Sequence, residues 1–398
     1  MYPSSTSYNP QAFKLFWIPF VRFFQLLCVS NYSVFYSTQR VGRLIYFLTF
    51  STLRIALLIY TLFSGLHIQM RPDGQHKYSR LMFYVNFVSL LGNILTQACA
   101  HLEPLFTRKH EEEIYRKLNE INQCFATKLN YVTNFEIIRK KYIWHTMTFF
   151  IISSGVSFSY SFYSLPGNDF DKFIFLLNRA LAVIIIRVRR CQLAFHINGL
   201  NNILFDLNFL LKRQQQNYRR NVIGSSSHSS EQIRYLRDIY SNIWIIKNLL
   251  SSCFGWTLLT FLVEFSLDLI NSSYWAYINI KIYESRNMII QIVCFIISIT
   301  VNFWYFCMIS ERCQNTGASV SNALHTPSNY FDRDYQRFIR IFSLQIRKQP
   351  IEIKMKQMFT FNHALMKSTI VLITTYVAIV IQFQISEENV PAHLKTSK

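Results

Sequence analysis

Glycine and acidic residues are scarce in this sequence. Its 398 residues include ten glycines and 21 Asp and Glu, against 41 Lys and Arg, and 51% of the chain is hydrophobic. Charged residues make up only 16%, which is low for a soluble enzyme of this size and indicates a membrane protein. The formal net charge of +20 is not gathered into a basic arm or a zinc-finger spacing, which argues against nucleic acid as a partner.

The chain also lacks the short motifs of catalytic and metal sites. HEEEI, which begins at His110, has Ile114 where the HExxH motif needs its second histidine, and GxGxxG, GxxxxGK[ST] and GxSxG are absent. The eight cysteines form no CxxC pair and lie mostly in or beside apolar runs. This favours buried packing thiols over a disulfide framework or a metal site. We therefore predict no enzyme, no catalytic residues, no metal and no cofactor.

Long apolar runs are abundant instead. A membrane helix needs about 20 apolar residues, and seven stretches approach or reach that length. The fold class we predict is an all-α integral membrane protein with seven transmembrane helices. The predicted spans are Leu44 to Leu66, Leu81 to His101, Tyr142 to Leu165, a fourth beginning near Phe173, Ile243 to Val263, Asn287 to Ser310 and Ser368 to Ser386.

The distribution of Lys and Arg predicts the orientation of these spans, because cytoplasmic connections accumulate basic residues. Basic residues gather before residue 44, between 102 and 141, after the fourth span and between 311 and 367. Those after the fourth span begin with Arg187, Arg189 and Arg190. The alternate connections hold far fewer. With seven spans, the N-terminus is predicted to be cytoplasmic and the C-terminus extracellular, which is the reverse of a G-protein-coupled receptor; DRY and NPxxY patterns are also missing.

Several cytoplasmic segments have apolar residues at helical spacing. One of them continues the fourth span through Leu200, Leu204, Leu207 and Leu211. These segments could form a compact anchor domain that binds other subunits, or could lie on anionic lipid headgroups. The predicted organisation is a cytoplasmic N-terminus with an interfacial helix (1–43), spans one to six (44–310) with a cytoplasmic helical connection (187–242), anchor helices (311–367), a last span (368–386) and an extracellular tail (387–398).

Polar and aromatic side chains within the spans are candidates for a binding site. Glu264 could line an outward-facing pocket or pore vestibule, or could extend to the membrane interface. Aromatic rings in the predicted outer halves could build an apolar pocket for a small molecule, although interfacial belts use the same residues. The candidate ligand-binding residues are Tyr84, Tyr160, Tyr163, Trp256 and Glu264.

The last span combines an apolar run with a glutamine near its far end. At about 100° per residue, Thr375, Ile379 and Gln382 share one helix face, and Tyr376 and Phe383 share the neighbouring one. Gln382 could bond to another helix, or several copies of it could surround an aqueous pore. The residues alone leave both alternatives open.

The stretch Thr375-Tyr376, five apolar residues and Gln382-Phe383 resembles the TYhhhhhQF signature at the C-terminal end of insect gustatory receptors. The preceding FTFNHALMKSTI is similar to the lead-in of that family. Chain length, seven spans, a cytoplasmic N-terminus and a long connection between spans four and five also match. The resemblance implies a ligand-gated, non-selective cation channel of four subunits, homomeric or heteromeric, whose last spans line a central pore in the plasma membrane.

The resemblance also implies roles for residues of the signature. Gln382 and Phe383 would lie at the pore constriction, Ile379 would face the conduction path, and Thr375 and Tyr376 would pack at the inner end and between subunits. The expected partners are a small-molecule tastant, permeant cations and membrane lipid. A bitter or aversive compound is the expected ligand, because the sequence does not resemble the sugar or carbon dioxide receptors. The alternatives are a metabotropic seven-helix receptor coupled to a G protein and a membrane transporter.

Overall fold

The computed structural model describes residues 17–24, scattered positions between 45 and 63, and residues 80–131, 133, 155, 169–220, 226–283, 286–324 and 333–388. The described part is helical apart from one two-stranded hairpin, which confirms the predicted all-α class. The first predicted span is described only at scattered positions, and the third, apart from Gly155, lies outside the described residues. The labelled α-helices are α3 (Arg80–Phe106), α4 (Arg108–Lys128), α6 (Asp169–Arg220), α7 (Ser226–Cys253), α8 (Gly255–Ile278), α9 (Arg286–Leu324), α10 (Arg333–Lys348) and α11 (His363–Glu388), and a short π-helix, η2 (Asn279–Tyr283), follows α8.

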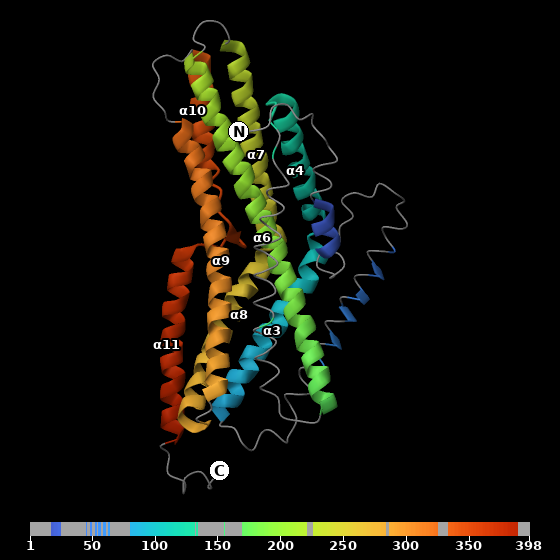
Figure 1. The fold of residues 1–398 in the computed structure, drawn as a ribbon, viewed down its shortest axis with the longest axis vertical. Coiled ribbons are helices and arrows are strands. Elements are labelled where there is room, and N and C mark those ends of the chain that lie inside the picture. Colours follow the sequence, from blue (N-terminus) through green and yellow to red (C-terminus); the bar gives the residue numbers. More distant parts are fainter. Residues whose placement is uncertain are drawn as a thin grey trace.

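The helices form a long bundle that divides into an upper and a lower half in Figure 1. Helices α6 and α9 run through both halves, and α6 alone has 52 residues, so the predicted continuation of the fourth span as a helix is confirmed. The other elements stop at the middle of the bundle. Helix α3 gives way to α4 there and α7 gives way to α8, while α10 lies in the upper half and α11 in the lower half (Figure 1).

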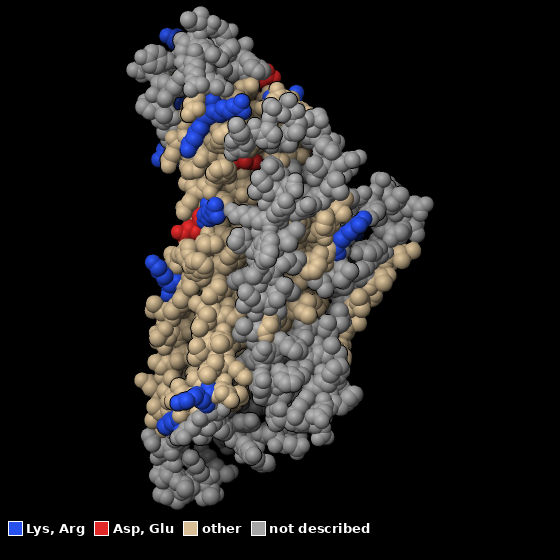
Figure 2. Space-filling view, in the orientation of Figure 1, with Lys and Arg blue, Asp and Glu red and all other residues tan. Residues whose placement is uncertain are grey.

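Charged side chains follow the same division. Figure 2 shows Lys and Arg over the upper half and at the lower end, with an uncharged band on the described surface between them. This band covers parts of α9 and α11, whose residues 287–310 and 368–386 include no Asp, Glu, Lys or Arg. Nineteen helical residues span about 28 Å, close to the thickness of a bilayer core. The lower half therefore has the dimensions and surface of a membrane-spanning bundle.

Two described helices, α9 and α11, are long and apolar enough to cross a membrane, and a third crossing exists if α7 and α8 count as one bent span. The sixth and seventh predicted spans lie within α9 and α11. The fifth, Ile243 to Val263, is wrong as a straight helix, because the chain breaks at Phe254 and bends by 56°. Periodicity missed this break, since the apolar pattern continues across it without proline.

A hairpin joins α10 to α11 and was not predicted. Strand β1 (Lys354–Met355) pairs antiparallel with β2 (Phe359–Thr360), and Lys356 and Gln357 in the turn have φ angles of 44° and 62°. Neither turn residue is glycine or asparagine, the usual sequence signals of such a turn. The hairpin lies at the middle of the bundle and directs the chain into the first turn of α11 (Figure 1).

The short helix at residues 17–24 packs on the protein through its apolar face. Trp17, Phe20, Val21 and Phe24 are buried against the protein. The Trp17 ring lies 4.7 Å from Phe195 and stacks on His196 at 5.8 Å between ring centroids. Burial, with a smaller contribution from the charge of Arg189, lowers the pKa of His196 to about 3, so this imidazole is neutral at physiological pH. The apolar face of this helix thus contacts α4 and α6, and its position at the membrane surface stays a prediction.

Candidate pore helix

Helix α11 has one face packed on its own chain and one face left open. Thr369, Ile373 and Gln384 are buried, and Val377 and Val380 are half-buried, so these positions define the packed face toward α8 and α9. Only 11% of the apolar stretch of α11 is buried within the chain. The open face is therefore available to lipid or to another protein copy.

The residues predicted for the pore all lie on the open side. Phe383 is 63% exposed and Tyr376 51% exposed, and Gln382, Ile379 and Thr375 are exposed as well. The Thr375 hydroxyl donates to the Val371 carbonyl at 3.1 Å, so it is satisfied within its own helix. The structure brings the predicted stripe together on one surface, as the helical spacing required.

Gln384 has the opposite environment from Gln382, although the two are separated by one residue. Its side chain is 5% exposed, and its Oε1 accepts a hydrogen bond of 2.9 Å from the Tyr274 hydroxyl of α8. Two positions along a helix correspond to a rotation of about 200°, so Gln382 and Gln384 lie on opposite faces of α11. Gln384 was not among the predicted site residues, although its spacing from Gln382 is visible in the sequence.

The base of α11 is fixed by polar contacts with α9. Asn362 accepts from the Leu365 amide at 2.9 Å, which is a helix cap, and Glu311 of α9 accepts from the His363 amide at 3.0 Å. The hydrogen bonds from the His363 backbone and side chain lower the pKa of Glu311 below its ordinary value. A carboxylate at this end also suits the positive pole of the α11 dipole.

The profile of the 7tm chemosensory receptor family matches residues 18–387. This chain belongs to the seven-transmembrane chemosensory receptor family. It is 21% identical to gustatory receptor 2a of Drosophila melanogaster over 366 residues, which cover 83% of this chain and 85% of the relative. Gustatory receptor 23a of the same organism is 23% identical over 168 residues, covering 41% of this chain and 44% of the relative. The resemblance to gustatory receptors is thereby confirmed.

Solved structures show the same fold. The insect olfactory receptor OR5 from Machilis hrabei in complex with eugenol aligns with a TM-score of 0.65 at 12% identity, over 93% of this chain and 99% of that one. The structure of OR5 described without eugenol aligns with a TM-score of 0.64 at 13% identity, over 94% and 100% of the two chains. The receptor is thus a multi-pass membrane protein with the fold of the insect olfactory receptor OR5, and its family membership confirms that it is not an enzyme.

The candidate ligand-binding residues of the receptor do not form one described cluster. Tyr84 is exposed near the start of α3, whereas Trp256 lies at the start of α8, where its amide contacts Glu103. Glu103 follows Tyr84 by 19 positions on α3, which corresponds to about 28 Å along the helix. Trp256 therefore lies at the middle of the bundle and not in an outer half. Tyr160 and Tyr163 lie outside the described residues.

Glu264 is neither exposed nor at an outer end. It is buried in α8, and its carboxylate accepts from Arg190 of α6, whose guanidinium lies 3.9 Å from the centre of the Phe261 ring. Arg187 and Arg189 are buried as well, so the three arginines counted as cytoplasmic surface charge lie inside the protein. These three arginines therefore give no support to the predicted orientation, because the positive-inside pattern concerns charges in connecting loops.

Proposed function

We propose that this receptor is a ligand-gated, non-selective cation channel in which four copies surround a central pore lined by α11. The observation that carries the proposal is the open face of α11: only 11% of this apolar helix is buried in its own chain, and Gln382 is exposed on it. An amide side chain within hydrocarbon needs a polar partner or water. Four copies around a pore would provide both.

Within this pore, Gln382 and Phe383 form the constriction and Ile379 faces the conduction path one turn below. Thr375 and Tyr376 pack toward the inner end and against a neighbouring copy. Ligand binding favours an expanded arrangement of the four α11 helices, in which Phe383 rotates away and Gln382 lines a wetted path. The exposed positions of all five side chains on α11 support this assignment.

The proposed orientation places the N-terminus and the upper half of the bundle in the cytoplasm and the C-terminus outside, at the plasma membrane of a taste neuron. The uncharged band of the lower half and the charges of the upper half support it (Figure 2). The upper parts of α6 and α9, with α7 and α10, then form the anchor domain. In this arrangement the four copies meet in the cytoplasm as well as at the pore.

The proposed ligand is a small bitter or aversive tastant bound among the outer parts of the earlier spans. The two Drosophila relatives are named as gustatory receptors, and the Machilis receptor was solved with eugenol, which supports a small organic ligand. The pocket candidates are Tyr84, Tyr160, Tyr163, Trp256 and Glu264. Trp256 takes second place, because its contact with Glu103 puts it at the middle of the bundle and not in an outer part.

Tagged receptors in a cell line test this function. An epitope placed after Lys398 should be accessible to antibody on intact cells, whereas an N-terminal tag should need permeabilised cells. A panel of bitter compounds should then evoke cation currents that persist in excised patches without GTP. Currents that require GTP would support the metabotropic alternative and contradict the channel.

The pore assignment is tested in the same cells with two variants and a matched control. Gln382→Ala and Phe383→Ala should change relative ion permeability or leak current several-fold at unchanged surface expression. Ile385→Ala is the control, because Ile385 is an exposed apolar residue at similar depth but lies off the stripe of Thr375, Ile379 and Gln382. Ion permeability and leak current that are the same in all three variants as in the wild type would refute the pore assignment.

A further inference from the structure

The break between α7 and α8 leaves two helix ends inside the protein. Phe254 separates them and is fully buried, and its side chain offers no capping hydrogen bond to α8. The Phe254 amide donates to the Leu250 carbonyl and the Phe254 carbonyl accepts from the Leu258 amide, both at 2.9 Å. The Cys253 carbonyl and the first amides of α8 still need partners from elsewhere, because buried backbone groups without hydrogen bonds are costly. The partners come from two other helices, α3 and α6.

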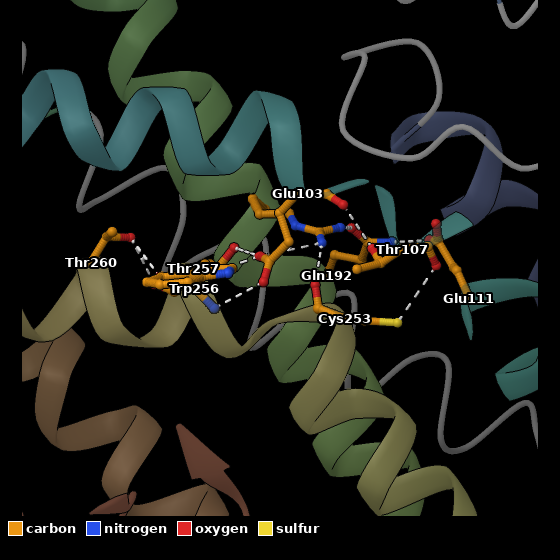
Figure 3. A network of polar contacts seen from close by, with 9 residues as sticks. Glu103, Thr107, Glu111, Gln192, Cys253, Trp256, Thr257 and Thr260 are labelled. Carbon is orange, nitrogen blue, oxygen red and sulfur yellow. Dashed lines mark hydrogen bonds and ion pairs between the residues drawn. The ribbon is translucent and has the colours of Figure 1, made fainter. Parts of the chain in front are cut away.

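Glu103 of α3 supplies the cap for α8. Its carboxylate accepts from the amides of Trp256 at 2.9 Å and Thr257 at 3.2 Å, and also from the Thr257 hydroxyl (Figure 3). Glu103 is 4% exposed. A buried carboxylate on the first free amides of a helix satisfies their hydrogen bonds and faces the positive pole of the helix dipole.

Arg189 of α6 supplies the cap for α7. It donates to the Cys253 carbonyl at 2.8 Å and to Gln192 at 2.8 Å, its guanidinium lies 4.0 Å from the Phe254 ring centre, and a nitrogen is 3.7 Å from Glu103. The negative pole of α7 thus meets a cation while the positive pole of α8 meets an anion. Each charge matches the helix end that it contacts, which a simple ion pair would not require.

The same bend touches the hairpin that precedes the pore helix. The Lys356 ammonium lies 5.4 Å from the centre of the Trp256 ring, and a Cβ at Gly255 would lie 2.9 Å from Cδ of Lys356. Beyond the hairpin, Phe361 packs on Phe303 at 5.1 Å between ring centres. Phe361 also stacks on Phe261 of α8 at 6.2 Å between ring centres. The first turn of α8 therefore contacts the turn of the hairpin, and the next turns of α8 contact Phe361, two residues before α11.

We propose that Glu103 and Arg189 are positioning residues for gating: they fix the α7–α8 bend, and the bend sets the position of the hairpin and of α11. This inference rests on the proposed channel function. Movement of α3 or α6 in the lower half would displace one of the two caps, and the hairpin would carry the displacement to the pore helix. Neither residue lies on α11.

The experiment uses the full-length receptor, first in cells and then purified. Glu103→Gln keeps the size of the side chain but removes its charge. We expect basal cation current per surface receptor to change about 3- to 30-fold, the factor that corresponds to the loss of one helix cap. In the purified protein, amide hydrogen exchange should quicken at residues 255–258 and, in parallel, at the hairpin residues 351–362. Glu112→Gln is the control, because it removes an acidic charge from a surface pair on α4.

A charge swap separates capping from simple pairing. Exchanging the two residues, Glu103→Arg with Arg189→Glu, recreates an ion pair but places each charge at the wrong helix end, so we expect no recovery of the wild-type current. Recovery would overturn the proposal. If Glu103→Gln does not reach the surface, Thr257→Val carries the test, because it removes only the hydroxyl that donates to Glu103.

Failure of this inference is distinguishable from failure of the proposed function. The positioning role alone would be overturned if the wild-type receptor conducts and the Glu103→Gln and Glu112→Gln variants have equal currents and equal rates of amide hydrogen exchange. A wild-type receptor without cation current would overturn the channel. The exchange measurement would still show whether the cap at residues 255–258 and the hairpin respond together.

Discussion

Helices α9 and α11 are the two described helices that are individually long and apolar enough to cross a membrane, yet their own chain covers them to different degrees. In α9, 44% of the apolar stretch is buried, and in α11 only 11%. Phe303 of α9 is fully buried and stacks on Phe265 at 4.1 Å between ring centres, whereas Phe383 of α11 is 63% exposed. Hydropathy does not distinguish these two phenylalanines. Their difference shows that α9 supports the fold and that α11 is built to meet something outside the chain.

The largest expected effect comes from truncating the two phenylalanines in turn. Phe303→Ala should destabilise the receptor by about 3 kcal/mol, the lower end of the range for a buried Phe, because lipid already shelters apolar groups from water. Phe383→Ala should leave stability nearly unchanged and alter conduction. Thermal unfolding of the purified receptor, combined with surface expression, measures both. Equal destabilisation would mean that the two helices do not differ in their structural role.

The next effect concerns the two glutamines of α11. Tyr274→Phe removes the hydroxyl that donates to Gln384, and we expect a loss of about 1–2 kcal/mol together with an altered basal current, because this bond helps to fix the rotation of α11. Gln384→Leu should cost less in the Tyr274→Phe background than in the wild type. Tyr376→Phe removes the same hydroxyl from an exposed position of α11 and is the control. Additive losses in the double variant would show that the bond does not couple the two helices.

A smaller effect is expected from the open face itself. Tyr376→Ala removes a half-exposed ring. If this ring packs against a neighbouring copy, its loss should lower the fraction of tetramer in detergent without lowering the melting temperature of the subunit. Size-exclusion chromatography with light scattering measures this fraction. Ile385→Ala, on the other flank of the open face, is the comparison. An unchanged tetramer in both variants would indicate that lipid covers this part of α11.

The smallest effect lies at the contact that joins α9 to α11. The pKa of Glu311 is lowered in the folded receptor, so its carboxylate stabilises the fold above the ordinary carboxyl pKa of 4.5, and this contribution is lost as the pH falls through the lowered value. Wild type should therefore unfold at a slightly higher temperature than Glu311→Gln at pH 7, and the gap should close toward pH 3. Melting curves across this range provide the measurement. A difference in melting temperature between the two proteins that grows in acid would mean that the pKa of Glu311 is raised and not lowered.

Local sequence patterns, namely uncharged runs and helical spacing, predicted much of the fold. The uncharged runs placed the predicted sixth and seventh spans within α9 and α11, and helical spacing placed Thr375, Ile379 and Gln382 on one face. The same spacing extended α6 far beyond its membrane part. These predictions succeeded because each depends on residues within one helix. These local patterns did not predict the break at Phe254, because the residues that cap its two helix ends lie on α3 and α6, more than 60 residues away in sequence.

The sequence by itself determined the class, the family signature and which side chains of α11 share a face, because hydropathy and helical periodicity are local properties. Only the tertiary structure decided what each face meets. It buried Arg187, Arg189 and Arg190, paired Glu264 with Arg190, placed the helix at 17–24 against protein and gave Gln384 a partner on α8. Burial and pairing depend on which distant helices come together, and one helix's sequence does not specify its neighbours.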